Sequence, residues 1–500
     1  MNHRRNAECF IITCIGLLMS MNTLCLARPT GNGVRVLFME PDSATVRCEM
    51  PVYRLVTDTN RINAYRGWID NEPAQWAIKL YGEASRIVEA RRKMIEEVPA
   101  YHIALIQGGN EAAIGFCLRD NSGMIQSYPH VPYIKLAPED WVFTTTFLHE
   151  TGHVVLYLLN DGKEIPKSDL ISIPHSTAAL TDRGTAFDKG FAIHLETLAS
   201  RFSNNSVVRE RYHHDRYLFG IASIQSEYHR QVADLLTYSQ SRARYHDVAE
   251  NDFAFCSAFK GPDYLRVQLE KSRDYSCLRS ADQLLQSEGF YASFFYSFLL
   301  RGSVVPTLDT VNPREDRMLR ALAFMFGSYQ ISPQSPFLLW FTESYRKLYP
   351  QEAPDIIEAL LELSHGVFVD QQASAIWRDH YLGALRLDMS ERYNKSILDS
   401  LSRWRADALE DPRVLYSCLG PQIRCAVPED SVKLVAFGDA SVLSFDVNTV
   451  EEGVIRMIPQ ISDRQVRSWL KEREKLPYAD VVDFKNRSGL SKTVLEHLMF

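Results

Sequence analysis

The sequence predicts an α+β protein: a small sheet and a helix bearing two histidines, then a large helical body and a small C-terminal helical domain. Three observations carry this prediction. Short strand-like segments dominate the first part of the chain, residues 190–410 are almost wholly helical in pattern and rich in aromatic side chains, and the character changes again near residue 411. A sheet followed by a run of helices is typical of the α+β class.

The first predicted domain, residues 28–200, begins with strands and ends with helices. Helices are predicted at 73–97 and 144–159, and a third covers the segment AFDKGFAIHLETLASRF. Strands are predicted at 34–38, 45–58, 101–107, 112–118 and 131–140.

Three further segments complete the predicted organisation. Residues 201–410 form a mainly helical body that completes the cleft of the first domain. Residues 411–445 form a turn-rich connector with a hairpin of two strands around Gly438-Asp439, and residues 446–500 form a compact helical domain.

Composition and charge limit the function classes. The chain has 500 residues, of which 46% are hydrophobic and 23% charged, as in a globular protein with more than one core. Its formal net charge of -7 argues against a protein whose whole surface is basic and binds nucleic acid.

Residues 1–27 have the pattern of a secretory signal peptide. The basic start MNHRR precedes an apolar run that is too short to span a membrane comfortably, and Ala27 precedes Arg28-Pro29 like a cleavage point. The sequence therefore predicts a secreted or periplasmic protein without a membrane span in the mature chain. An uncleaved N-terminal anchor is the alternative interpretation.

Six cysteines remain after the predicted cleavage, an even number that permits disulfides in an exported protein. Cys418 and Cys425 bracket a short turn and are the favoured local pair, although the sequence does not fix the pairing.

The segment TTTFLHETGHVVLYLL, residues 144–159, carries the clearest chemical signal. On a helix, His149 and His153 are one turn apart and project from the same face, so both imidazoles can reach one metal ion. Glu150 lies beside them, where a carboxylate base can activate water for attack on a peptide carbonyl. The alternative is two ordinary buried histidines, which would need hydrogen-bond partners inside an apolar helix.

This segment resembles the HExxH zinc site of the zincin metallopeptidases, over about residues 100–200. No third histidine follows closely after His153, so the resemblance is to the glutamate branch, the gluzincins, in which a second helix supplies a carboxylate ligand. It implies a Zn2+ cofactor, a peptide or protein substrate, His149 and His153 as metal ligands, and Glu150 as the general base.

The third ligand is the point at which the sequence departs from the gluzincins. The core of DKGFAIHLE is similar to their Glu-Gly-Phe-Ala signature, but Lys189 stands where those families have the ligand Glu, and an ammonium cannot bind zinc. Glu196 lies two turns along the same helix face as Lys189 and is the first choice for the third ligand. Asp188 is the second choice.

His175 lies between the two helices on a polar, turn-rich segment. It is a candidate for stabilising the transition-state oxyanion or for binding substrate. As a structural residue it would brace its loop, and the sequence leaves both interpretations open.

Residues 446–500 resemble the paired helix-hairpin-helix modules of competence-type DNA-uptake proteins and of type II secretion minor pseudopilins. The match rests on Asn448-Thr449, on residues 458–462 and on residues 488–491. Such hairpins bind DNA where glycines bring backbone N–H groups against a phosphate. Here glutamine or serine replaces three of the four hairpin glycines. Ser462 and Ser491 are predicted N-caps, with Gln465 completing a capping box after Ser462.

Three functional hypotheses follow. The first is an exported zinc-dependent metallopeptidase. The second is a catalytically weak or inactive zincin-fold scaffold that binds other proteins, for which Lys189 is the main support. The third is an envelope DNA-binding protein that acts through the C-terminal domain. A protein-docking role for that domain is favoured over DNA binding, because acidic side chains offset its basic face.

Overall fold

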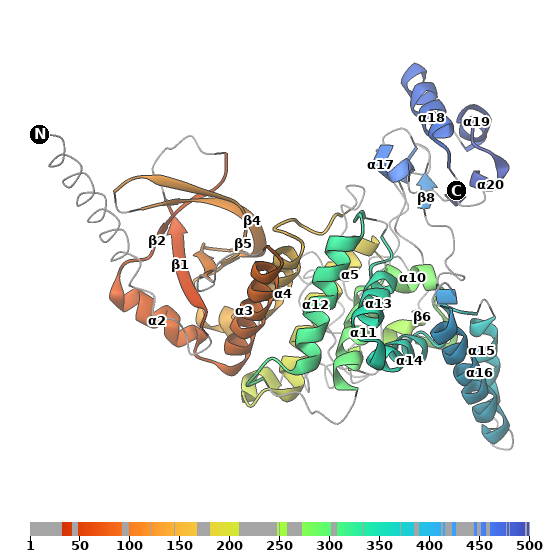
Figure 1. Ribbon diagram of the computed structural model, residues 1–500, viewed down its shortest axis with the longest axis horizontal. Helices are drawn as coiled ribbons and strands as arrows, with labels where there is room; N and C mark the ends of the chain where they lie inside the picture. Colours follow the sequence, from red (N-terminus) through yellow and green to blue (C-terminus); the bar gives the residue numbers. More distant parts are fainter. Residues whose placement is uncertain are drawn as a thin grey trace, which may run out of the picture. The chain divides into compact units, whose positions relative to one another are not determined.

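The computed structural model describes residues 33–42, 49–92, 100–120, 122–144, 146–167, 181–209, 248–249, 251–257, 273–301, 308–333, 335–370, 372–384, 390–411, 414–415, 423–426, 445–447, 452–456, 461–476, 478–479, 481–495 and 498–499. The chain separates into two compact units, Met1–Lys163 and Glu164–Phe500. It combines helices with sheets, as the α+β class requires (Figure 1). The predicted signal peptide and the predicted hairpin around Gly438 lie outside the described residues.

The first unit contains a closed five-stranded barrel with the strand order β1-β2-β4-β5-β3. The strands are β1 Arg35–Pro41, β2 Val52–Leu55, β3 Ala100–Leu105, β4 Asn110–Arg119 and β5 Ile125–Leu136. β4 and β5 form an antiparallel hairpin, whereas β3 runs parallel to both β1 and β5. The register of the hairpin shifts between Ile114 and Phe116, where Gly115 has a φ of 81° that favours glycine.

Side chains fill the interior of this barrel. Its buried cluster consists of Met39, Tyr53, Ala104, Phe116 and Tyr133. The hydroxyls of Tyr53 and Tyr133 lie 3.2 Å apart and satisfy one another by a hydrogen bond. The described side chains inside this five-stranded barrel therefore form a packed core.

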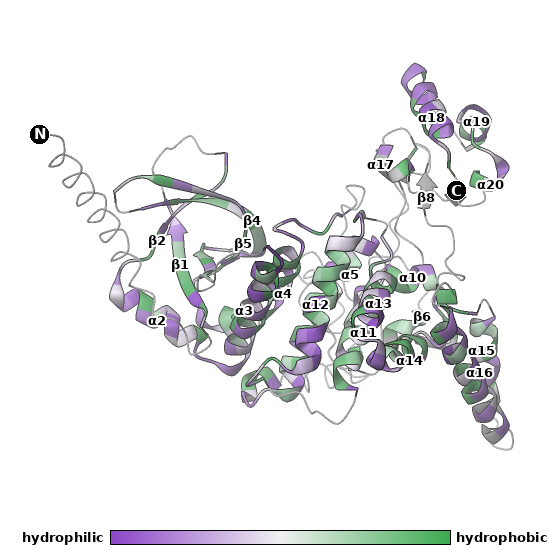
Figure 2. Ribbon diagram, viewed as in Figure 1, coloured by the Kyte–Doolittle hydropathy of each residue, from purple (hydrophilic) through white to green (hydrophobic). Residues whose placement is uncertain are grey.

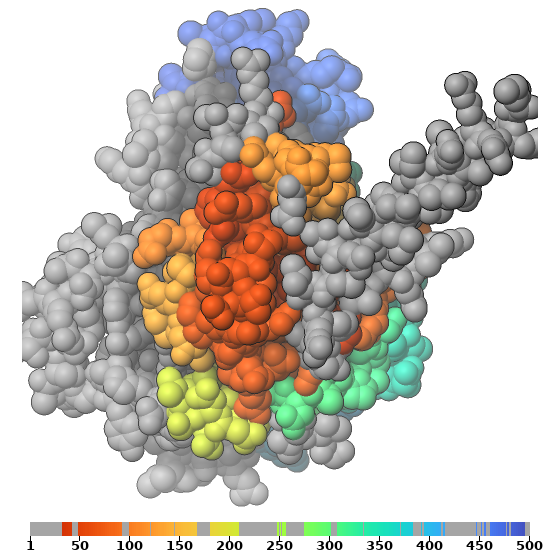
Figure 3. All heavy atoms as spheres, turned by 90° about the vertical axis from the view of Figure 1, so that its left-hand side faces the viewer, coloured from red at the N-terminus to blue at the C-terminus, as the bar shows by residue number. Residues whose placement is uncertain are grey.

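The described residues of the first unit include the helices α2 Thr59–Ile69, α3 Glu72–Arg92 and α4 Thr146–Leu159, and the short 3-10 helix η2 Asp140–Thr144. α3 confirms the predicted helix at 73–97 as far as Arg92, beyond which residues 93–97 lie outside the described residues, and α4 confirms the predicted helix at 144–159 from Thr146 onward. Sequence reasoning missed α2, which begins at the N-cap Asp58. α3 packs against α4, and α4 contacts β4 and β5. In Figure 3 the red and orange atoms of this unit gather at the centre of the view.

The second unit is built on a group of helices with an aromatic core. These helices are α5 Arg183–Phe202, α10 Ala281–Leu285, α11 Glu288–Leu300, α12 Pro313–Ser328, α13 Phe337–Leu348, α14 Ala353–Leu363, α15 Ala373–Ala384 and α16 Ser390–Glu410. Phe187 of α5 stacks on Phe337 of α13, with ring centroids 4.7 Å apart. Phe295 of α11 packs edge-on against Phe191 and Phe341. The predicted helical, aromatic-rich pattern is confirmed in these segments.

Among the described residues of the stretch 190–410, which the sequence predicts to be almost wholly helical, a pair of short strands lies between the helices. β6 Phe255–Ser257 pairs antiparallel with β7 Arg273–Leu278. A disulfide joins Cys256 to Cys277 across this pair, with Cα atoms 5.4 Å apart. Strands this short leave no periodic pattern in the sequence. Cys418 of the favoured local pair lies outside the described residues.

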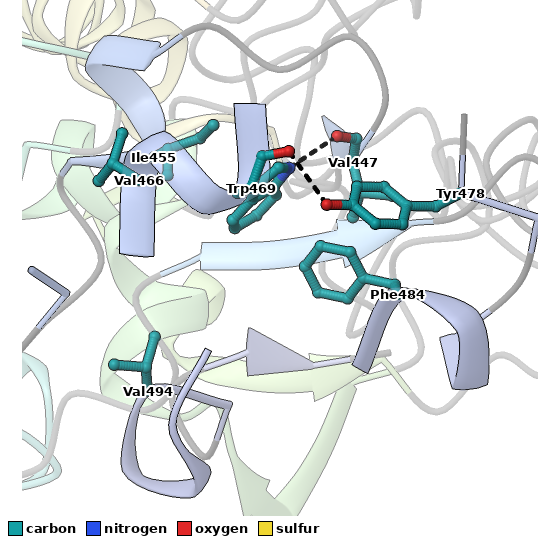
Figure 4. Close-up of a cluster of buried hydrophobic side chains, with 7 residues drawn as sticks. All are labelled: Val447, Ile455, Val466, Trp469, Tyr478, Phe484 and Val494. Atoms are coloured by element: carbon teal, nitrogen blue, oxygen red, sulfur yellow. Dashed lines mark hydrogen bonds between the residues drawn. The ribbon is translucent and has the colours of Figure 1, made fainter. Parts of the chain in front are cut away.

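The C-terminal segment has its own small core. Its helices are α17 Glu452–Ile455, α18 Asp463–Lys475, α19 Val481–Arg487 and α20 Lys492–Leu495. Its sheet consists of β8 Ile423–Ala426, β9 Phe445–Asp446 and β10 Leu498–Met499. Trp469 of α18 is fully buried, and its indole N–H donates to the Val447 carbonyl at 2.9 Å (Figure 4). The outer surface of α18 is charged, and the helix is mostly purple in Figure 2.

The predicted N-caps of this segment are confirmed. Ser462 accepts from the Gln465 backbone N–H, and the Gln465 side chain accepts from the Ser462 backbone N–H, which completes the capping box. The Ser491 hydroxyl accepts from the Val494 backbone N–H at 3.3 Å. No helix among the described residues is long and apolar enough to span a membrane.

Candidate functional site

Helix α4 carries the two histidines and is held firmly against its neighbours. Eleven of its 14 residues are buried, including Phe147, Leu148 and Val155. The Thr151 hydroxyl donates to the Phe147 carbonyl and lies 2.8 Å from the hydroxyl of Tyr101 on β3. The helix is therefore fixed to the barrel wall by polar contacts as well as by apolar packing.

The imidazoles of His149 and His153 converge. Their Nε2 atoms are 3.2 Å apart and their ring planes are 78° apart, with His153 only 2% exposed and His149 half-buried. Two nitrogens that each lie about 2.0–2.1 Å from one tetrahedral zinc ion are about 3.3 Å apart. The pair therefore fits two ligands of a single zinc ion. The same distance also suits a hydrogen bond from one ring to the other.

The Glu150 carboxylate is buried between α4 and the barrel. Glu150 is only 6% exposed, and its Oε2 accepts a hydrogen bond from the backbone N–H of Ala112 on β4 at 2.8 Å. This contact orients the carboxylate from outside its own helix. Sequence reasoning missed Ala112 and Tyr101, because backbone groups and cross-element contacts leave no residue-type signal.

Glu196, the first choice for a third ligand, is half-buried on α5. The boundary between the two units falls after Lys163, whereas the first predicted domain extends to residue 200, so α5 belongs to the second unit. Its role as a ligand stays a prediction. His175 lies outside the described residues.

Asp188, the second choice, is fully buried and already has a cationic neighbour. Its Oδ2 lies 3.0 Å from the Lys167 ammonium. Burial lowers the pKa of Lys167, but the charge of Asp188 and the hydrogen bond to it outweigh that effect and raise the pKa above its ordinary value. Metal binding by Asp188 would therefore compete with an established ion pair.

The Gly-Phe-Ala core of α5 has a packing explanation. A Cβ at Gly190 would lie 2.4 Å from the Tyr291 Cβ and 2.6 Å from the Glu288 carbonyl oxygen, so glycine allows α5 and α11 to approach closely. Phe191 is fully buried against Phe295. These contacts account for the Gly-Phe pair without a metal ligand at Lys189.

His194 is a core residue of the second unit. It is fully buried between Phe191 and Phe295, and its Nδ1 is hydrogen-bonded to the Phe191 carbonyl. Burial lowers the pKa of His194 to about 3, while the hydrogen bond acts in the opposite direction. The ring is therefore neutral at physiological pH.

Within the described parts of the chain, no group of three or more His, Cys, Asp or Glu side chains is arranged to hold a metal ion. The converging pair of His149 and His153 thus supplies two ligand positions. Comparisons with models of protein families, with curated proteins and with solved structures find no match to this chain.

Proposed function

We propose that this chain is an exported zinc-dependent metallopeptidase that hydrolyses peptide bonds. The observation that carries the proposal is the 3.2 Å separation of the His149 and His153 Nε2 atoms, with the buried Glu150 carboxylate on the same helical turn. Glu196 or Asp188 would complete the ligand set. Bound zinc would act as a Lewis acid toward the substrate carbonyl and the attacking water.

The chain's own residues have separate roles in this reaction. Glu150 takes a proton from the attacking water as the C–O bond forms, and returns a proton to the leaving amine as the C–N bond breaks. The hydrogen bond from the Ala112 backbone N–H keeps the carboxylate in one orientation during both transfers. His175 is proposed to stabilise the oxyanion or to bind the peptide.

Chelation tests the proposal directly. Treatment of the purified mature protein with a zinc chelator is expected to abolish hydrolysis of a mixed peptide library, and added zinc is expected to restore it, because the metal supplies the electrophile. Cleavage is measured by mass spectrometry of the products. Cleavage that survives complete removal of zinc would contradict the proposal.

A zincin-fold scaffold without catalytic activity is the alternative. It is favoured by the absence of a three-ligand group among the described residues and by the ion pair that occupies Asp188. It predicts that substitution of Glu150 leaves the biological phenotype intact, whereas the peptidase requires that carboxylate.

For the C-terminal domain we propose protein docking in preference to DNA binding. The Ser462–Gln465 capping box occupies the backbone N–H groups of Ser462 and Gln465 at the start of α18, so these two groups are not available to a phosphate. Arg464, Arg467 and Lys471 are exposed along α18 and would meet an acidic protein surface. Salt-sensitive DNA binding by the full chain, lost on reversing these charges, would favour the third hypothesis instead.

A further inference from the structure

The two ends of the barrel in the first unit differ in how their cations are partnered. At the end where β4 begins and β5 finishes, Lys135 forms an ion pair with Glu111 at 2.6 Å. At the opposite end, β1 begins at Arg35. Arg35 lies on the same face of β1 as Met39, which belongs to the interior cluster, because side chains alternate along a strand.

His102 lies on the next strand at the same end. It pairs with Leu37 across β1 and β3, shares the inward face of Ala104, and is only 7% exposed. Its ring packs against Phe116 and Tyr128, with centroid distances of 5.0 Å and 6.1 Å. Phe116 and Tyr128 are themselves stacked across β4 and β5.

Two nitrogen atoms at this end are buried without hydrogen-bond partners in the described part of the chain: Nε of Arg35 and Nδ1 of His102. Burial, and then the nearby charge of Arg35, lower the pKa of His102 to about 4, so the imidazole is neutral at pH 7. A neutral imidazole can carry its proton on Nδ1 and donate from it. An unmade hydrogen bond at a buried donor costs about 1–3 kcal/mol.

We propose that the Arg35 end of the barrel is a binding site for a small organic oxyanion, held by Arg35 and His102 against the partly exposed ring of Tyr128. An acceptor group there would accept from the Arg35 Nε–H and from the His102 tautomer that is protonated on Nδ1, and it would balance the guanidinium charge, as Glu111 does for Lys135 at the other end. The filled interior places the ligand at the mouth of the barrel. A carboxylate attached to an apolar group suits these neighbours best, since the guanidinium matches its two oxygens and the Tyr128 ring matches its body.

An NMR titration of His102 tests this site. The pKa of the assigned His102 ring is measured in sodium chloride, sodium benzoate and sodium phosphate at equal ionic strength. Benzoate is expected to raise the pKa from about 4, because a bound anion offsets the charge of Arg35. A response to benzoate alone identifies a carboxylate site, and a response to both salts identifies a general oxyanion site.

Arg35→Gln is the decisive variant, and Arg54→Gln is its matched control. Arg54 is an exposed arginine of β2 that is paired with Glu40, so its loss should not affect the site. Arg35→Gln is expected to weaken benzoate binding about tenfold or more, because a charge-assisted hydrogen bond is lost. Arg35→Lys keeps the charge without the planar fork, and serves if the glutamine variant does not fold. Identical His102 titrations in all three salts, or an unchanged response in both Arg35 variants, would overturn the proposal.

Discussion

Replacing Glu150 with glutamine is expected to leave zinc bound and to lower peptide hydrolysis by about 10²–10⁴-fold, the contribution of a positioned general base. The amide has nearly the shape of the carboxylate but cannot accept the proton of the attacking water. Glu150 is buried, and the hydrogen bond from the Ala112 backbone N–H holds its carboxylate in place. Steady-state cleavage of an identified peptide, together with the zinc content, measures both effects.

Glu111→Gln is the matched control for this substitution. Glu111 is 62% exposed in its side chain and lies on β4 beside Ala112, where it pairs only at the surface with Lys135. The control is expected to retain both zinc and activity. If Glu150→Gln hydrolyses peptides as well as the control does, the assignment of the general base is wrong.

Replacing Asp282 with alanine is expected to destabilise the second unit by about 3–5 kcal/mol, because it leaves a buried charge unbalanced. Arg183 at the start of α5 is fully buried, and its Nη2 lies 2.5 Å from Oδ1 of Asp282 on α10. The other oxygen of Asp282 accepts from Gln286 at 2.8 Å. The free energy of unfolding is measured by denaturant titration.

A surface pair and a double substitution provide the comparison. Asp316→Ala breaks the Arg320–Asp316 pair, whose side chains are 46% and 30% exposed, and is expected to cost about 1 kcal/mol or less. Arg183→Met combined with Asp282→Leu removes both charges and is expected to recover much of the stability. Equal decreases in the free energy of unfolding for Asp282→Ala and Asp316→Ala would show that the buried ion pair contributes no more to stability than the surface pair.

The local elements were predictable because each has a signal within a short window. The barrel strands β1, β3, β4 and β5 form where the sequence is alternating or apolar, and α4 forms in the continuous apolar run around the histidines. Closure of the barrel was not predictable, because it depends on pairing β1 with β3 and β2 with β4 across long stretches of chain. The Cys256–Cys277 pairing was hidden for the same reason.

The candidate site was likewise predictable only where its signal is local in the sequence. The i, i+4 spacing of His149 and His153 predicted that their rings would meet, and their Nε2 atoms do converge. The Gly-Phe-Ala similarity was less informative, because Gly190 has a packing role against α11 that a local motif cannot reveal. Which carboxylate completes the metal site depends on tertiary placement, and it stays a prediction for Glu196 and Asp188.

Zinc content is the most direct test of the central claim that His149 and His153 hold a metal ion. The mature protein, expressed in zinc-replete medium and dialysed, is compared with His153→Ala, Glu196→Ala and Asp188→Asn. His130→Ala, which removes an exposed histidine of β5, is the control. We expect one zinc per chain in the wild type and the control, its loss in His153→Ala, and its loss in whichever carboxylate variant removes the third ligand. A wild-type protein without zinc, or a His153→Ala variant that binds zinc as well as the wild type, would contradict the account.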